Sequence, residues 1–109
     1  MQAKYRLKAR ASFTYIYNKG QSFSNPLFRL VFVKAGSPKI GISVGKKVGN
    51  AVCRNRVKRR INAAFREYMP KLNGRYNYIV LARSEIANAP YSEILKQAER
   101  SLNKLGHLK

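Results

Sequence analysis

The chain has 109 residues and a formal net charge of +19, because 23 Lys and Arg stand against only four Glu and no Asp. This length suits one domain, since two separate cores would each be too small to be stable alone. The acids are too few for the paired carboxylates, two-metal centres and Asp-supported triads of protein enzymes. The chain has one cysteine, Cys53, and one histidine, His107, which excludes a disulfide framework and a Cys/His zinc cluster. We expect His107 to be solvated.

Positive charge is concentrated in residues 1–66, which hold 16 cations and no acid. Such unpaired like charges repel one another in a compact chain and favour a polyanionic partner. We expect that partner to be nucleic acid, whose phosphates release counterions when cations bind. An anionic membrane is the alternative, but no stretch approaches the roughly 20 apolar residues of a membrane span. The first residues also lack the apolar core of a signal peptide, so we expect a cytoplasmic protein.

The first predicted helix begins near Ser12 and ends before Gly20, with Phe13, Ile16 and Tyr17 on one face. Residues 27–34 are aromatic and β-branched and predict a strand. After a turn at residues 36–38, the alternating residues 39–44 predict a second strand that pairs with the first as a hairpin.

A longer helix is predicted over residues 51–69, capped by Asn50. Its apolar residues share one face: Val57, Ile61, Ala64, Phe65 and Tyr68. Residues 76–82 predict a buried strand, and residues 89–105 a last helix with Pro90 in its first turn and Gly106 at its end. The order α-β-β-α-β-α predicts a single α+β domain over residues 1–109, with one β-α-β crossover. The basic residues 1–10 have two alternatives before nucleic acid binds, an ordered segment of this domain or a flexible N-terminus.

The basic run at residues 46–60 carries the most information, because seven of its fifteen residues are cationic and none is acidic. On a helix, Arg59 lies opposite the apolar stripe, Arg56 and Arg60 lie on one flank, and Arg54 and Lys58 lie on the other. Guanidinium groups fit phosphate oxygens, and the interleaved asparagines can bond to phosphate, sugar or base edges. A solvated face would usually mix the two signs of charge, so the run favours phosphate binding.

Residues 43–47, 49–52 and 54–59 read SVGKK, GNAV and RNRVKR, which resembles the arginine-asparagine-arginine signature of the bacterial ribonuclease P protein subunit. The likeness extends to residues 6–8 with Phe13, Tyr17 and Gly20, and to residues 78–83. It therefore covers most of the chain.

The resemblance implies a basic subunit that joins a catalytic RNA and helps it to cut the 5′ leader from precursor tRNA. It also implies a small mixed sheet with a left-handed β-α-β crossover, although the general rule for such crossovers predicts the right-handed form. No catalytic side chain, bound metal, membrane or protein partner is expected, and Mg²⁺ is expected on the RNA phosphates.

The resemblance further implies two binding sites. Eight residues that match the family's motif are expected to face RNA: Lys46, Lys47, Asn50, Arg54, Asn55, Arg56, Lys58 and Arg59. Arg60 continues this basic surface in the present chain and is the ninth expected RNA-binding residue. Four residues are expected in a cleft that receives the single-stranded leader: Phe13, Tyr17, Arg29 and Val31. Core packing is the alternative for Phe13 and Tyr17. Asn62 stands where the family often has a cation.

Two other functions agree with parts of the sequence. A ribosomal or other structural RNA-binding protein would share the charge and the α+β pattern. A self-sufficient nuclease would need acids that the chain lacks, so we rank it lowest.

Overall fold

The computed structural model describes Leu7 and residues 10–108, and the side chains of residues 10–12 are not described. Most of the basic segment 1–10 therefore lies outside the described residues. The elements along the chain are α1 (Arg10–Lys19), β1 (Gln21–Ser24), β2 (Phe28–Lys34), β3 (Lys39–Ser43), η2 (Lys46–Val48), α2 (Ala51–Tyr68), η3 (Met69–Lys71), β4 (Tyr76–Ala82), η4 (Ser84–Asn88) and α3 (Tyr91–Lys104). This arrangement confirms the predicted α+β class.

The four strands form one mixed sheet in the order β1-β2-β4-β3. The predicted hairpin between residues 27–34 and 39–44 is wrong, because β4 lies between them, antiparallel to β2 and parallel to β3. The burial of β4 explains this position. Its consecutive residues Tyr78, Ile79 and Val80 are all buried, so both faces are covered and both edges are paired.

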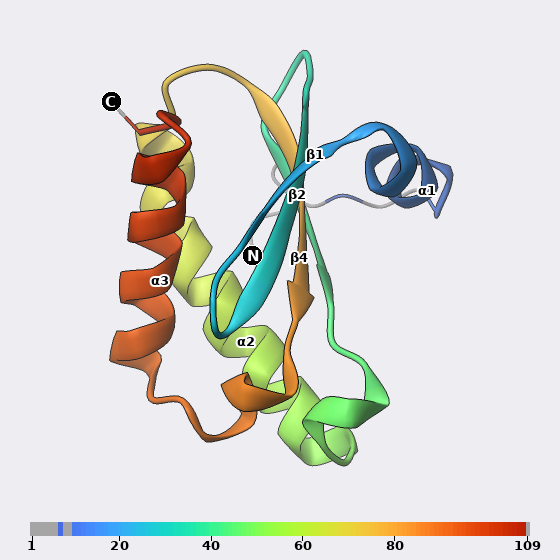
Figure 1. The fold of residues 1–109 in the computed structure, drawn as a ribbon, viewed down its shortest axis with the longest axis vertical. Helices are drawn as coiled ribbons and strands as arrows, with labels where there is room; N and C mark the ends of the chain where they lie inside the picture. Colours follow the sequence, from blue (N-terminus) through green and yellow to red (C-terminus); the bar gives the residue numbers. More distant parts are fainter. Residues whose placement is uncertain (1–6, 8–9, 109) are drawn as a thin grey trace.

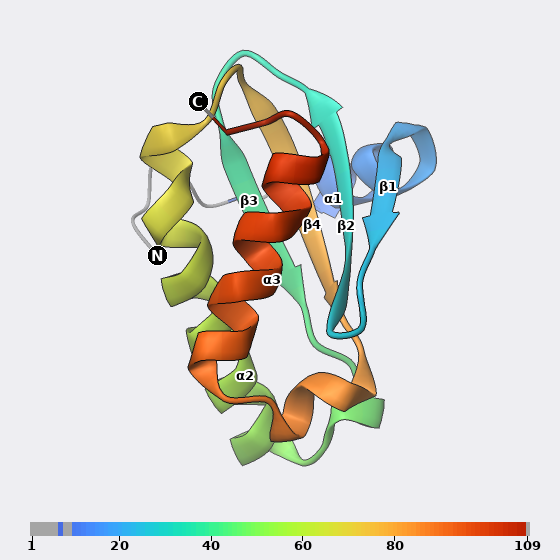
Figure 2. The same cartoon turned by 60° about the vertical axis from the view of Figure 1, so that its left-hand side comes forward.

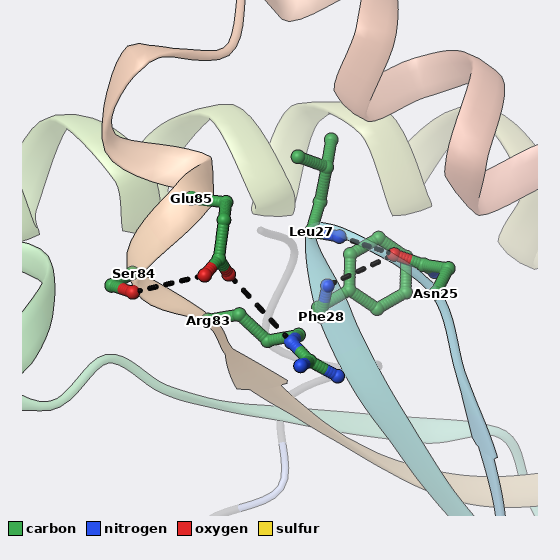
Figure 3. Close-up of polar contacts among 6 residues, drawn as sticks. All are labelled: Asn25, Leu27, Phe28, Arg83, Ser84 and Glu85. Atoms are coloured by element: carbon green, nitrogen blue, oxygen red, sulfur yellow. Dashed lines mark hydrogen bonds and ion pairs between the residues drawn. The ribbon is translucent and has the colours of Figure 1, made fainter.

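Strand β1 was not predicted, since its sequence QSFS has only one apolar residue. It pairs antiparallel with β2 through a turn that Asn25 stabilises. The Asn25 Oδ1 atom accepts hydrogen bonds from the backbone N–H groups of Leu27 at 2.8 Å and Phe28 at 2.9 Å (Figure 3). The side-chain amide of Asn25 also donates to Ser101 Oγ at 2.9 Å, which ties this turn to α3.

The crossover β3-α2-β4 is left-handed, as the resemblance implied. Figure 2 views the sheet from the side of α2 and α3, where β3 and β4 both run downward. Helix α2 lies at the β3 edge, on the same face of the sheet as α3, and β4 lies to the right of β3. A right-handed crossover would place β4 to the left in this view.

Helices cover the two faces of the sheet unequally (Figure 1). On one face, α2 and α3 enclose the larger apolar cluster, which includes Phe28, Leu30 and Phe32 of β2. On the other face, α1 covers a small cluster of buried residues: Leu7, Ile16, Val31 and Ile79. Residues of β2 therefore alternate between the two clusters, with Phe28, Leu30 and Phe32 on one face and Val31 on the other.

The first and last residues of the two long helices lie close to where the sequence indicated, with one exception at the start of α3. Asn50 caps α2 by accepting a hydrogen bond from the Cys53 N–H at 2.9 Å. Gly106 follows α3 with a φ of +75°, a conformation that favours glycine. Pro90 lies just before α3, as its N-cap residue, and not in its first turn. No helix in the described part of the chain is long and apolar enough to span a membrane.

Candidate nucleic-acid interface

The core-facing side of α2 determines where its cations lie. Its buried residues are those predicted from periodicity: Val57, Ile61, Ala64, Phe65 and Tyr68. The six cations of α2 are therefore distributed over its two flanks and its outer face, and none of them forms an ion pair with a described residue. Across the described chain, the ion pair that the structure shows is the exposed Arg83–Glu85 pair at 3.7 Å (Figure 3).

One flank of α2 is open toward the end of β3. Arg54, Asn55 and Lys58 line a hollow of about 220 Å³ together with Val44 and Ala51. The Nε atom of Arg54 is buried there and has no hydrogen-bond partner among the described residues. These positive and amide groups lie close together, and none of the described acids forms an ion pair with them.

The other flank of α2 packs against η4. The Arg60 Nη1 atom donates to the carbonyl oxygen of Ala89 at 3.2 Å. The Arg56 Nη2 atom lies 3.5 Å from the carbonyl oxygen of Ala87. The nine predicted RNA-binding residues thus do not share one face, and Arg56 and Arg60 have intramolecular partners that the sequence did not reveal.

We expect Arg60→Ala to lower the free energy of unfolding by about 1 kcal/mol, because the Ala89 carbonyl loses its partner. Arg59→Ala is the matched control, since Arg59 is exposed and makes no described contact. Thermal unfolding of both variants gives the measurement. Equal stability of the two variants would mean that the Arg60 contact contributes nothing to folding.

Three further predicted residues lie at the start of α2. Lys46 and Lys47 are exposed on η2, directly before the helix. Asn50 is exposed too, but its side-chain oxygen is engaged in the cap, which leaves its amide group available. This end of the helix also carries the positive end of the helix dipole, which favours an anionic ligand.

Two of the four residues predicted for the leader cleft, Phe13 and Tyr17, line a hollow of about 300 Å³ between α1 and the open part of the sheet. Phe13, Thr14, Tyr17 and Asn18 line it from α1, and Ser43, Ile79 and Leu81 line it from the strands. Tyr17 is 56% exposed, so core packing does not account for it. Phe13 is half-buried and packs against the small cluster beneath α1, so it has both a core contact and a hollow-facing surface.

The two predicted β2 residues of this cleft differ in accessibility. Arg29 is exposed on the α1 face, where its Nη2 atom donates to Ser22 Oγ at 3.3 Å. Val31 is only 2% exposed, because Ile16 of α1 covers it. The prediction that Val31 contacts the leader is therefore wrong for this structure: Val31 supports α1 from below.

A third hollow, of about 400 Å³, joins the two predicted sites. Lys58 and Asn62 of α2 line it together with Phe13 of α1. Leu7 and residues 40–42 of β3 complete it. The sequence did not predict this junction, because nothing local places α1 beside α2 across the β3 edge. Phe13 lines both this hollow and the one beside Tyr17, so the basic flank of α2 and the aromatic cleft are neighbours.

Comparisons with known proteins identify the family of the chain. The family model described as ribonuclease P matches residues 1–106. Proteins named ribonuclease P protein component include one from Listeria innocua, 41% identical over 88% of this chain and 83% of its own length. Another from Oceanobacillus iheyensis is 38% identical over 100% of this chain and 93% of its own length.

Solved structures give the same result. The ribonuclease P protein of Staphylococcus aureus has a TM-score of 0.87 and 32% identity, covering 96% of this chain and 98% of that chain. The protein of Thermotoga maritima has a TM-score of 0.82 and 26% identity, covering 91% of this chain and 96% of that chain. The sequence motifs, the fold and these matches together show that the chain belongs to the ribonuclease P protein family.

Proposed function

We propose that the chain is the protein subunit that assists a catalytic RNA in removing the 5′ leader from precursor tRNA. Its family is that of the protein component of this endoribonuclease, which works with an RNA subunit and a tRNA substrate. The observation that carries the proposal is the adjacency of two surfaces. The cations of α2, which form no ion pair with a described residue, lie beside an aromatic-lined hollow, and Phe13 lines both surfaces.

Each surface has its own task in this proposal. The exposed cations of η2 and α2 bind phosphates of the catalytic RNA, with Arg54, Asn55 and Lys58 forming the most enclosed part. The hollow beneath α1 receives the leader. There Tyr17 offers an aromatic surface that stacks on bases with little sequence preference, and the exposed Arg29 meets a phosphate.

The chemistry of bond cleavage is assigned to the RNA. Four glutamates and one histidine give the chain few groups for acid–base or metal-assisted catalysis. In the described part of the chain, no three His, Cys, Asp or Glu side chains are grouped to hold a metal ion. We therefore assign Mg²⁺ to the RNA phosphates. The protein positions the leader and screens phosphate charge.

The test is a cleavage assay with the purified protein, its RNA subunit and a precursor tRNA at low Mg²⁺. We expect the protein to raise the rate, because its cations replace part of the screening that Mg²⁺ would supply. RNA alone at high Mg²⁺ should cleave at the same bond, whereas the protein alone should not cleave. Absence of stimulation would refute the proposed function. Cleavage by the repurified protein alone would reassign the chemistry to its side chains.

Replacing Tyr17 by Ala tests the leader site. We expect affinity for precursor tRNA to fall about five- to tenfold, because one stacked base is lost. Affinity for leaderless tRNA should stay unchanged. Tyr15→Ala is the matched control, since Tyr15 is also an exposed tyrosine of α1 (60% exposed) but does not line the hollow. Equal losses on both RNAs would show that Tyr17 does not contact the leader.

A further inference from the structure

The ring of Phe13 lies directly on the backbone of β3 at Gly41. A Cβ atom added at Gly41 would lie 2.6 Å from Phe13 Cε1 and nearer still to Phe13 Cζ. Contacts below 3.0 Å are essentially never found for a real Cβ. Gly41 is buried, and its backbone has no positive φ that would itself require glycine. The Phe13 ring thus occupies the space that a side chain at residue 41 would need.

The position of that ring determines the shape of the groove on both sides of it. Phe13 lines the hollow that contains Tyr17 and also the hollow that contains Lys58 and Asn62. If the ring stood higher above β3, it would project further between these two hollows. With the ring lowered onto Gly41, the hollow beside Tyr17 and the hollow beside the basic flank of α2 lie next to each other, with the ring between them.

We propose that Gly41 is a positioning residue for RNA binding, acting through Phe13. The missing side chain lets the Phe13 ring lie low on β3, so that a single strand passes from Tyr17 to Lys58 without a barrier. In this arrangement Tyr17 is the stacking surface and Phe13 is the floor. The inference rests on the proposed function, because it assumes that the cleft receives the leader.

The decisive variant is Gly41→Ala, the smallest change that fills the space. The fold should survive it, because the obstructing atoms are the far end of one side chain and alanine suits a strand better than glycine. The Phe13 ring should move instead. We expect affinity for precursor tRNA to fall about fivefold through weakened contact with the displaced cleft, and affinity for leaderless tRNA to stay the same.

Replacing the Phe13 ring by a shorter side chain should restore part of the affinity for precursor tRNA. Leucine lacks the outer ring atoms that meet the added Cβ, so Gly41→Ala with Phe13→Leu should bind precursor more tightly than Gly41→Ala alone. Phe13→Leu alone supplies the fourth corner of this double-mutant cycle. Gly36→Ala is the matched control, because a Cβ at Gly36 meets nothing within 4 Å. A purely structural role for Gly41 would affect both RNAs equally and would not be rescued in this way.

Nuclear Overhauser contacts between the Phe13 ring and residue 41 show whether the ring has moved, independently of whether leader binding has changed. Their loss in Gly41→Ala, with leader-dependent binding reduced, is the expected result. Unchanged ring contacts, or a displaced ring with undiminished leader-dependent affinity, would overturn the role of Gly41. If the wild-type protein itself does not distinguish precursor from leaderless tRNA, the leader site of the proposed function fails instead, and the positioning role fails with it.

Discussion

Replacing both Arg54 and Lys58 by Ala should weaken RNA binding about 10- to 100-fold, because two charge-assisted phosphate contacts are lost. Both side chains line the hollow on the open flank of α2, and neither hydrogen-bonds to another described residue. The variant should therefore fold with an unfolding temperature close to that of the wild type. The same change at Arg56 and Arg60 would mix binding with stability, because those residues contact the carbonyl oxygens of Ala87 in η4 and of Ala89, which follows η4.

Salt dependence identifies the type of contact that is lost. The slope of log affinity against log salt should become shallower by about 1.5 to 2 for the double variant, since each phosphate contact contributes somewhat less than one unit. Arg66→Ala with Lys104→Ala removes the same charge from exposed positions outside the hollow and serves as control. Equal slopes for the two double variants would mean that only net charge matters, and that the α2 flank has no specific role.

The local features of the fold could be predicted because they depend on residues close in sequence. The apolar spacing of α2 and the cap at Asn50 were predicted residue by residue and are confirmed. The same spacing separated Arg54 and Lys58 from Arg56 and Arg60, which the structure places on opposite flanks. A helical projection needs only the sequence and 3.6 residues per turn.

Strand pairing could not be predicted in this way. A turn at residues 36–38 does reverse the chain after β2, but β4, some 40 residues later, takes the place beside it. Burial determines which strand pairs with β2, because the apolar β4 lies in the centre of the sheet and the shorter β3 lies at its edge. The hollow formed by Phe13, Lys58 and Asn62 was missed for the same reason, because it exists only once β3 is at that edge.

His107 is the clearest case of a residue whose surroundings come from distant segments. We expected it to be solvated near the end of the chain, but it is only 4% exposed. Its ring stacks on Tyr76 with centroids 3.8 Å apart, and its Nδ1 atom shares a hydrogen bond of 2.8 Å with the buried Tyr78 hydroxyl. Its carbonyl oxygen accepts from the Asn73 N–H. These contacts fasten the chain end after α3 to the start of β4.

Protonation of His107 should therefore destabilise the fold. Burial lowers its pKa below the ordinary value of 6.5, so the unfolded chain takes up a proton at a higher pH than the folded chain. The stabilising effect is complete above the unfolded pKa and is lost as the pH falls from about 7 toward the folded pKa. Each pH unit of this interval should lower the free energy of unfolding by up to about 1.4 kcal/mol.

Two substitutions separate packing from protonation at this site. His107→Ala should lower the free energy of unfolding by about 3 kcal/mol, because it removes a buried ring and leaves the Tyr78 hydroxyl unpaired. His107→Phe keeps a ring against Tyr76 but cannot be protonated, so its loss should be smaller and the same from pH 5.5 to 8. Denaturant unfolding across this range gives the measurement. A wild-type stability that does not fall below pH 6.5, or a His107→Phe profile that still follows it, would contradict this role for His107.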